Sequence, residues 1–378
     1  MTELRITAVD NRRERRDFID VQQRLYRDDR QAVTPLFFER RQTFAPHAPF
    51  FDHAQARFWV AYRGGEPVGR ISAQIDQLHL ERHGDGCGYF GVPEAADAEV
   101  MQALLTHAEG WLREAGLRGA RGPFNLSINQ ECGLLVEGFD TPPMVFMGHA
   151  RPFYGAAIEQ AGYVPARDLL AYVVRPDFTA PAVMKRLLRQ VGAALRVRPL
   201  EVARIDEEVA LLRDIFNDAW ADNFGFVPFT EREFGELRPL LRYLMDHRFV
   251  QVAELDGRPV AMIAALPNLN EVIADLDGRL LPLGWARLLW RLKVRHPRSA
   301  RVALMGVRRE FQHTRLGGTL AFAVIEAVRW ALHARGVRDV EMSWILEDNK
   351  GMRDIIEAIG GRIYKRYRLY EKLWGPAP

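Results

Sequence analysis

A polar loop between two apolar stretches carries residue types that bind phosphate. It runs from Val307 to Leu320 and reads VRREFQHTRLGGTL. A glycine pair opens the helical pattern that follows, and the free N–H groups of a helix N-terminus bind anions. Glycines let a diphosphate approach the backbone closely, and Arg308, Arg309 and Arg315 would add charge-assisted contacts. The loop is typical of a phosphate site, but its spacing fits an ordinary strand-to-helix turn equally well.

Two common nucleotide signatures are missing from this loop. No Gly-Lys-Ser/Thr follows it, as a nucleotide P-loop requires. The loop holds no Gly-x-Gly-x-x-Gly, and no acidic residue closes a strand about 20 residues further on, as a dinucleotide site requires. The loop therefore predicts neither kind of nucleotide site.

The composition is that of an ordinary globular protein. Of 378 residues, 48% are hydrophobic, and 52 basic residues nearly balance 49 acidic ones. The formal net charge of +3 does not call for a nucleic-acid partner. Cys87 and Cys132 form no metal-binding or disulfide pattern, so we expect no metal and a reducing compartment. The first residues lack an apolar leader, and no stretch of about 18 apolar residues occurs, so we expect a cytoplasmic protein.

A faint internal repeat indicates how the phosphate loop is positioned. Residues 61–68 read AYRGGEPV and residues 253–260 read AELDGRPV, and each predicts a β-hairpin with a glycine-containing turn. Gly116 and Gly336 each end a helical pattern, and an Asn follows each after 13 residues. Two copies of one domain explain both correspondences.

The elements around the loop predict the fold class. Strand patterns at Val302–Val307 and Val340–Ile345 flank the long helical pattern that contains Leu320 and Leu332. This strand–helix–strand order predicts an α/β fold with a mixed, α+β-type sheet and helices on its faces. We expect an N-terminal domain at 1–174, a connector at 175–195 and a C-terminal domain at 196–378.

The stretch 302–370 resembles the GNAT superfamily of acyl-CoA-dependent N-acyltransferases. The family's Q/R-x-x-G-x-G/A signature is matched by Gln312 and Gly317 at its ends, whereas Arg315 replaces its first glycine. The family's next signature, a strand followed by an Asn and a helix, is similar to Met342–Gly361. The first half resembles the same fold without the cradle, because its corresponding helix starts with the acidic residues Glu94, Asp97 and Glu99.

The whole chain, including GPFNLSIN at 122–129 and GFDTPP at 138–143, resembles a bacterial group of tandem GNAT proteins. Some relatives in that group are implicated in long-chain amide formation, as in bacterial ceramide synthesis. The resemblance implies two tandem GNAT-like domains and an acyl-CoA N-acyltransferase. Its co-substrate would be acyl-CoA, held by the C-terminal domain, and its acceptor would be an amine, such as a sphingoid-type amino lipid.

The resemblance also implies which residues bind the acyl-CoA. Gly306 would form a bulge that aims an N–H at the thioester oxygen, or would only allow tight packing. Asn349 would bond the pantetheine arm, cap the following helix, or do both. The complete predicted set is Met305, Gly306, Val307, Gln312, His313, Thr314, Arg315, Leu316, Gly317, Gly318, Thr319 and Asn349.

The acid and the base are less well marked. The family often has a Tyr seven residues after the Asn, and Ile356 stands there. Tyr364 and Tyr367 are the predicted substitutes, unless they are half-buried strand aromatics. Glu347 is the predicted base, unless it is only a helix-start charge. The other candidates are Asp348, Glu341, His313, His149 and Glu131.

Residues 280–295 read LLPLGWARLLWRLKVR and predict a basic amphipathic helix. Such a helix lies in a membrane interface, roofs an acyl pocket, or simply packs on the sheet. The first of these alternatives would give a peripheral contact with the inner membrane face through Trp285–Arg295. Two other functions stay open: a non-catalytic acyl-CoA-binding module, and an aminoacyl transferase that uses aminoacyl-tRNA.

Overall fold

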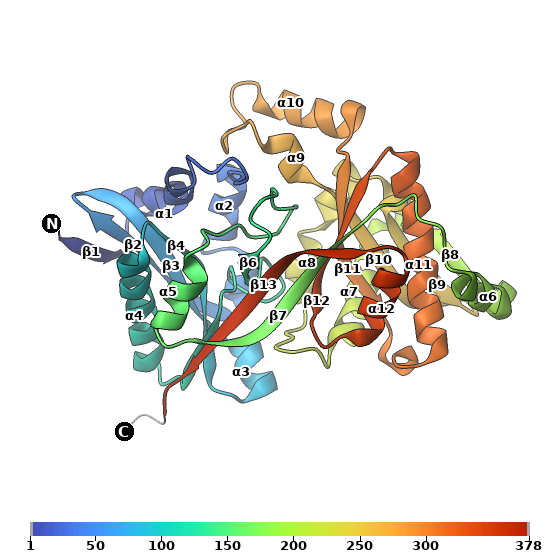
Figure 1. Cartoon of the computed structure of the whole chain (residues 1–378), viewed down its shortest axis with the longest axis horizontal. Coiled ribbons are helices and arrows are strands. Elements are labelled where there is room, and N and C mark those ends of the chain that lie inside the picture. Colours follow the sequence, from blue (N-terminus) through green and yellow to red (C-terminus); the bar gives the residue numbers. More distant parts are fainter. Residues whose placement is uncertain (1–2, 376–378) are drawn as a thin grey trace. The chain divides into compact units, whose positions relative to one another are not determined.

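The computed structural model describes residues 3–375 and divides them into two compact units (Figure 1). The first unit contains the chain up to Leu169, the segment Ile273–Trp285 and the chain from Lys365 onward. The second contains Leu170–Val272 and Ala286–Tyr364. Each unit is therefore discontinuous in sequence, whereas the predicted domains are continuous. The domain boundaries expected from the sequence, at residues 174 and 196, therefore stay a prediction.

The first unit has a mixed sheet that the C-terminal strand completes. Its strand order is β1-β2-β3-β4-β5-β13, and β6 also pairs with β13. Only the pair β4–β5 is parallel. Tyr370 and Leu373 of β13 pair with Gly122 and Gly119 of β5, which explains why the last residues belong to this unit. The strands are β1 Leu4–Ala8, β2 Ala54–Arg63, β3 Glu66–Asp76, β4 Cys87–Ala95, β5 Gly119–Gly122, β6 Leu134–Glu137 and β13 Arg362–Leu373.

Helices cover both faces of this first sheet. Neighbouring side chains on a strand point to opposite faces. At Gly69 an added Cβ would lie 2.6 Å from Val100 of α4, whereas the next residue, Arg70, donates to the carbonyl of Phe18 in α1. Helices α1 and α4 therefore pack on opposite faces. The helices are α1 Arg12–Leu25, α2 Phe37–Thr43, α3 Gln77–His83, α4 Ala98–Glu114 and α5 Tyr154–Gln160.

The second unit repeats this plan. Its sheet follows the order β8-β9-β10-β11-β12, and only the pair β11–β12 is parallel. The strands are β8 Leu195–Pro199, β9 Val250–Leu255, β10 Arg258–Pro267, β11 Ser299–Val307 and β12 Asp339–Leu346. The strand–helix–strand order predicted around the phosphate loop is confirmed, and with it the mixed α/β fold class.

Helices of the second unit also lie on both faces of its sheet. Gly306 packs against Ala219 of α7, whereas Ile263 and Val302 lie against side chains of α11. The helices are α6 Ala182–Val191, α7 Ile205–Trp220, α8 Glu231–Gly235, α9 Leu269–Ile273, α10 Gly284–Trp290, α11 Arg315–Ala334 and α12 Lys350–Ala358. The division between the units falls inside β7 (Val164–Val174), α9, α10 and β13.

Both sequence correspondences of the repeat have structural counterparts. The two predicted hairpins are β2–β3 and β9–β10. Gly65 and Gly257 have φ values of 83° and 79° in their turns, a region in which glycine is favoured. Gly116 and Gly336 follow α4 and α11 with φ values of 79° and 76°. The repeat therefore reflects two similarly built units. Among residues 3–375, no helix is both long and apolar enough to cross a bilayer.

Candidate active site

The predicted phosphate loop joins β11 to α11 in the second unit. After a 3₁₀ turn at Arg309–Phe311, α11 begins at Arg315 and Thr314 caps it: its Oγ1 accepts from Gly317 N at 3.0 Å. A Cβ at Gly317 would lie 2.1 Å from the carbonyl oxygen of Phe311, so the turn closes only with glycine there. A Cβ at Gly318 would meet nothing within 4 Å. The first turn of α11 is therefore tight at Gly317 and open at Gly318.

Side chains of the loop hold it in place against α7. The Gln312 amide donates to the carbonyls of Ala219 at 2.7 Å and Val307 at 2.8 Å. Arg308 lies 2.5 Å from an oxygen of Asp214. The signature residue Gln312 thus fixes the shape of the loop.

Arg309 also pairs with α7: its backbone N–H donates to Asp218 at 2.9 Å, and its guanidinium lies 3.4 Å from the same carboxylate. The sequence-based idea that Arg308 and Arg309 bind phosphate is therefore not favoured: both guanidinium groups already face carboxylates. Arg315 and His313 are exposed, and His313 has a φ of 60°. Within the loop, Arg315 is the arginine best placed to meet a solvent-borne anion.

The strands β11 and β12 separate beyond their first four residue pairs. Their ladder runs from Ser299↔Asp339 to Val302↔Met342 and has no register after that, although both strands continue. A strand edge without a neighbour offers N–H and C=O groups to an extended ligand. The gap between 303–307 and 343–346 can therefore receive a flexible arm that carries amide groups.

The structure decides between the two predicted backbone roles of Gly306. The irregularity of β11 lies at Ala303, which is skipped between the pairs Ala264↔Leu304 and Ala265↔Val302. Gly306 pairs regularly with Met262. A Cβ added at Gly306 would lie 2.8 Å from the Cβ of Ala219, so only glycine leaves room for that side chain. Tight packing against α7 therefore explains the glycine, and no bulge lies there.

Met305 and Val307 flank Gly306 and share in the same packing. The Met305 carbonyl accepts from the Trp220 indole at 2.7 Å, and Val307 pairs with Ala261 of β10. Leu316 is half-buried and Thr319 is buried in the first turns of α11. The Thr319 hydroxyl donates to the Arg315 carbonyl at 2.8 Å. The contacts of these predicted binding residues hold β11 and the first turns of α11 in place.

A buried polar cluster lies where the two strands separate. Arg301 is 1% exposed, donates to the Ser343 hydroxyl at 2.7 Å and lies 3.3 Å from the Glu341 carboxylate. Its guanidinium also lies 4.3 Å from the centre of the Trp344 ring. Tyr364 donates its hydroxyl to the fully buried Glu341. A buried charge is tolerated when it is paired and hydrogen-bonded, as it is here.

This cluster brings together two residues that the sequence could only name separately. Tyr364 was a predicted acid and Glu341 an alternative base, 23 positions apart in sequence. Arg301 and Ser343 were missed. The sequence signal that could have revealed them is a charged residue, Arg301, inside the mostly apolar pattern of β11 and a polar residue, Ser343, inside that of β12.

The remaining predicted catalytic residues lie elsewhere. Glu347 is half-buried just after β12, and its carbonyl accepts from Arg353 at 2.8 Å. Asn349 caps α12 by accepting from Met352 N at 3.1 Å, so its capping role is confirmed. Tyr367 belongs to the first unit, where it is fully buried opposite Leu135 of β6. That position favours a core role for Tyr367. Among residues 3–375, no group of three His, Cys, Asp or Glu side chains could hold a metal.

The first unit contains a second buried polar cluster. Glu94 at the end of β4 accepts from the Tyr154 hydroxyl at 3.1 Å and lies 3.7 Å from Arg70. Burial raises the pKa of Glu94 to about 7, against the opposing effect of Arg70. Nearby, Arg40 of α2 lies 2.5 Å from Glu131, in the loop between β5 and β6. Sequence reasoning interpreted Glu94 only as a charge that would repel phosphate.

Comparisons with known proteins agree with the fold. Residues 20–121 match the family model described as "Acetyltransferase (GNAT) family". Protein YghO of Escherichia coli (strain K12) is 48% identical over 364 residues, which cover 96% of this chain and 93% of that protein. A protein named bacterial ceramide synthase, from Caulobacter vibrioides (strain NA1000 / CB15N), is 46% identical over 374 residues. That alignment covers 98% of this chain and 97% of the relative.

A solved structure shows the same fold at low sequence identity. A tandem GNAT protein from the clavulanic acid biosynthesis pathway, solved without AcCoA, aligns over 100% of both chains with a TM-score of 0.58 and 14% identity. The family model matches part of the first unit, and the solved tandem GNAT protein shares the two-unit fold. The chain belongs to the GNAT family. It is an N-acyltransferase of a family whose co-substrate is acyl-CoA, as the sequence signatures predict.

Proposed function

We propose that this enzyme transfers a long acyl chain from a CoA thioester to the amine of a long-chain amino alcohol. The relative named bacterial ceramide synthase, similar over nearly its whole length, supports this acceptor and this acyl group. The observation that carries the proposal is the end of the β11–β12 ladder at Val302↔Met342, which leaves residues 303–307 of β11 unpaired with β12 up to the loop that leads into α11. That arrangement suits a diphosphate with a long amide-bearing arm.

The proposed acyl-CoA lies along the second unit. Its diphosphate binds at the first turn of α11, where Gly318 is open and Arg315 is exposed. The pantetheine arm pairs with the strand edges in the gap between 303–307 and 343–346. The Asn349 side chain at the start of α12 contributes to the same end of the gap while it caps its helix.

The proposed reaction needs a neutral amine and a protonated leaving group. The amine nitrogen attacks the thioester carbon, an amide C–N bond forms, and the C–S bond breaks. One amine proton passes to a base, and the leaving thiolate takes up a proton. We assign the role of proton donor to Tyr364. Glu341 positions Tyr364 by accepting a hydrogen bond from the tyrosine hydroxyl. Glu347 stays the proposed base.

The proposed function is tested by amine-dependent thiol release. The purified protein is incubated with acyl-CoAs from two to eighteen carbons and with short amines or long-chain amino alcohols. Thiol release and the amide product are followed together. We expect release only when both a long-chain acyl-CoA and a long-chain amino alcohol are present. CoA binding without turnover would instead make the protein a non-catalytic acyl-CoA module. If product forms only with aminoacyl-tRNA, the acyl donor is aminoacyl-tRNA and not acyl-CoA.

We also propose that α10 contacts the membrane that holds the lipid acceptor. Trp285, Leu289 and Trp290 are 51%, 43% and 53% exposed, and Val294 just beyond the helix is 64% exposed. Arg287 and Lys293 supply positive charge along the same stretch. Exposed Trp and Leu side chains beside basic residues suit an anionic lipid interface.

A further inference from the structure

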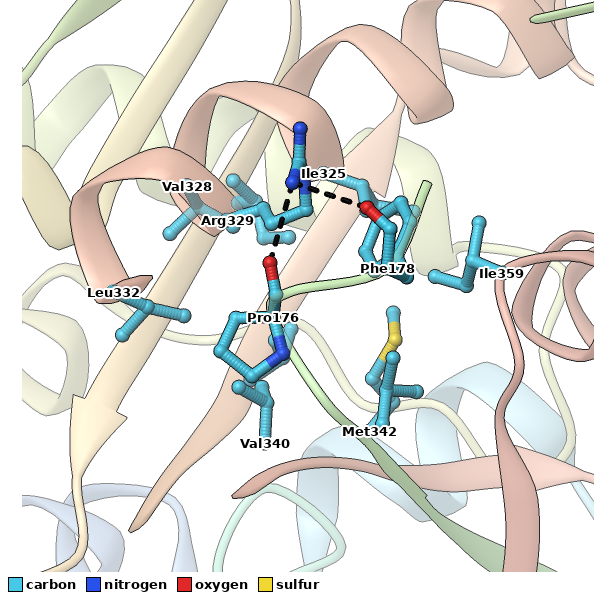
Figure 2. A pocket seen from close by; sticks show the side chains of 12 residues that line it. Pro176, Phe178, Ile325, Val328, Arg329, Leu332, Val340, Met342 and Ile359 are labelled. Carbon is cyan, nitrogen blue, oxygen red and sulfur yellow. Dashed lines mark hydrogen bonds between the residues drawn. The ribbon is translucent and has the colours of Figure 1, made fainter. Parts of the chain in front are cut away.

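The pocket between the sheet of the second unit and α11 is too small for a lipid chain (Figure 2). Its cavity volume of about 20 Å³ is room for one water molecule. Its lining belongs to the core, because Val302, Val328 and Met342 are 7%, 3% and 4% exposed. Figure 2 also shows Arg329 donating to two backbone carbonyls across it. This pocket therefore holds no lipid chain, whereas the surface of the first unit offers apolar side chains that are already exposed.

Four large apolar side chains stand out on the surface of the first unit. Leu281 is 80% exposed, Leu283 63%, Phe38 60% and Trp285 51%. Single exposed apolar side chains are common on protein surfaces, whereas several that lie together mark a contact with a partner or a membrane. Phe38 belongs to α2 and the other three to the segment Ile273–Trp285, so the question is how α2 and that segment are joined.

Direct contacts hold α2 and this segment together. The N–H of Phe37 donates to the Gly278 carbonyl at 2.9 Å. Gly278 has a φ of 74°, and a Cβ there would lie 2.9 Å from the carbonyl oxygen of Pro35, so this close approach needs glycine. Gln23 of α1 also donates to the Asp277 carbonyl at 3.4 Å. The loop that follows Gly278 is therefore anchored beside α2.

This anchoring determines which apolar side chains face outward. Phe37 packs on the hydrophobic core of the first unit, and the next residue, Phe38, is left on the exposed side of α2. In the anchored loop, the N–H of Trp285 donates to the Leu280 carbonyl at 2.9 Å and closes a turn over residues 281–284. Both exposed leucines lie in this turn. We call the four side chains the loop–α2 patch: Phe38, Leu281, Leu283 and Trp285.

The charges beside the loop–α2 patch are complementary to an anionic lipid surface. From Arg279 to Arg295 the chain has five basic residues and no acidic residue. Arg279 is exposed and stands two positions before Leu281 in the loop. Leucine side chains can enter an apolar layer while neighbouring guanidinium groups stay at the phosphates of the headgroups.

We propose that the loop–α2 patch inserts into the surface of a lipid bilayer. The inference rests on the proposed membrane contact of α10 and deepens it, because it adds elements of the first unit and names the turn at 281–284 as the part that enters the apolar layer. Leu281 and Leu283 then lie among acyl chains, and Trp285 lies at the level of the headgroups, where Trp is favoured. A lipid acceptor would be taken from that surface.

The depth of the turn can be measured with one fluorescent label, because the native Cys87 and Cys132 are both buried. Leu281→Cys carries the environment-sensitive fluorophore NBD. Val164→Cys is the matched control, since Val164 is 57% exposed in the same unit. Each labelled protein is mixed with phosphatidylcholine vesicles that contain or lack anionic phosphatidylglycerol. A blue shift of the emission, and quenching by lipids with brominated acyl chains, report entry into the apolar layer.

We expect the label at 281 to shift and to be quenched with the anionic vesicles, and the label at 164 to do neither. No shift at 281, or equal shifts at both positions, would overturn the proposal. Leu281→Ser together with Leu283→Ser should weaken vesicle binding about tenfold in co-sedimentation, because two exposed apolar anchors are lost. Binding equal to that of the parent would also overturn it.

Two further measurements separate this proposal from its alternatives. If ultracentrifugation finds a parent dimer that the double serine variant converts to a monomer, with vesicle binding unchanged, the patch is an interface between two copies and the proposal fails. Amine-dependent turnover with detergent-dispersed substrates should be the same in that variant and the parent. Turnover in a parent whose label at 281 does not shift would uphold the proposed function and reject the patch. A shift at 281 without any turnover would keep the patch and reject the function.

Discussion

At the scale of single residues, the proposed mechanism depends on how one hydroxyl is held. Tyr364 donates to Glu341, and Arg301 lies 3.3 Å from the same carboxylate. A carboxylate held by a guanidinium fixes the direction of the tyrosine hydroxyl. The residue types alone could not reveal this arrangement, because the contact of positions 301, 341 and 364 depends on strand register.

Tyr364→Phe removes the proposed donor with little change in shape. We expect amine-dependent turnover to fall by about 100-fold, the lower end of what positioned acid–base groups contribute, with unchanged affinity for the acyl-CoA analogue. Tyr62→Phe is the control, since Tyr62 of the first unit donates its hydroxyl to the Asp17 carboxylate at 2.8 Å. A similar loss of turnover in both variants, or none in Tyr364→Phe, would remove Tyr364 from the mechanism.

Glu94 predicts a pH-dependent stability. Its pKa is raised to about 7 in the folded protein, mainly by burial, and it returns to about 4.3 on unfolding. Between these two pKa values the folded state keeps a proton that the unfolded state has lost. The contribution of Glu94 to the free energy of unfolding is therefore full below about pH 4.3 and is lost as pH rises through 7.

Glu94→Gln keeps the neutral form at every pH. We expect the variant to gain stability relative to the parent between pH 5 and pH 8, by up to roughly 3 kcal/mol. Urea unfolding of both proteins at the two pH values measures the change. A difference in the free energy of unfolding that stays constant with pH would show that Glu94 ionises normally in the folded protein.

At the scale of elements, the hairpins and the β11–α11–β12 segment could be predicted because their signals are local. Alternating apolar residues, glycine turns and a glycine pair before a helix lie within a few positions of each other. Gly306 shows where this fails: a glycine in a strand fits a bulge or a close helix equally, and only the position of Ala219 decides. Gly317 and Gly318 look alike in sequence, yet only Gly317 is required by packing.

The element that we propose contacts a lipid membrane is α10. Leu289→Ser together with Trp290→Ser should reduce binding to vesicles that contain anionic phosphatidylglycerol by about tenfold, because two exposed apolar anchors are lost. Val183→Ser is the control, since Val183 is 49% exposed on α6. Vesicle co-sedimentation measures the binding. Equal binding by the double variant and the parent would reject α10 as the membrane contact.

At the scale of the whole molecule, the compact units do not follow the order of the chain, because each is built from separate stretches of sequence. β13 lies at the end of the chain, yet it pairs with β5 and β6 of the first unit. Glu371 of β13 lies 2.9 Å from Arg121, and Lys372 lies 2.8 Å from Glu109. Such pairing over some 250 positions leaves no local pattern, so continuous domains are the natural sequence-based expectation.

A fragment of residues 1–174 would match the predicted N-terminal domain but lacks β13. We expect it to be unfolded or to aggregate, because β5 becomes an unprotected edge, Arg121 loses Glu371 and Glu109 loses Lys372. Amide dispersion in an NMR spectrum, or cooperative thermal unfolding, measures this. A well-dispersed spectrum from the fragment alone would show that the first unit does not need its C-terminal strand.

The central claim is that the diphosphate of acyl-CoA binds at the open first turn of α11. Gly318→Asp tests it by calorimetry with a non-reactive acyl-CoA analogue, with Gly318→Asn as a neutral control of nearly the same size. An acidic residue in a first helical turn favours the helix but repels phosphate. We predict at least a tenfold weaker affinity for Gly318→Asp than for Gly318→Asn, with both variants as stable as the parent. Equal affinities in the two variants would contradict the claim.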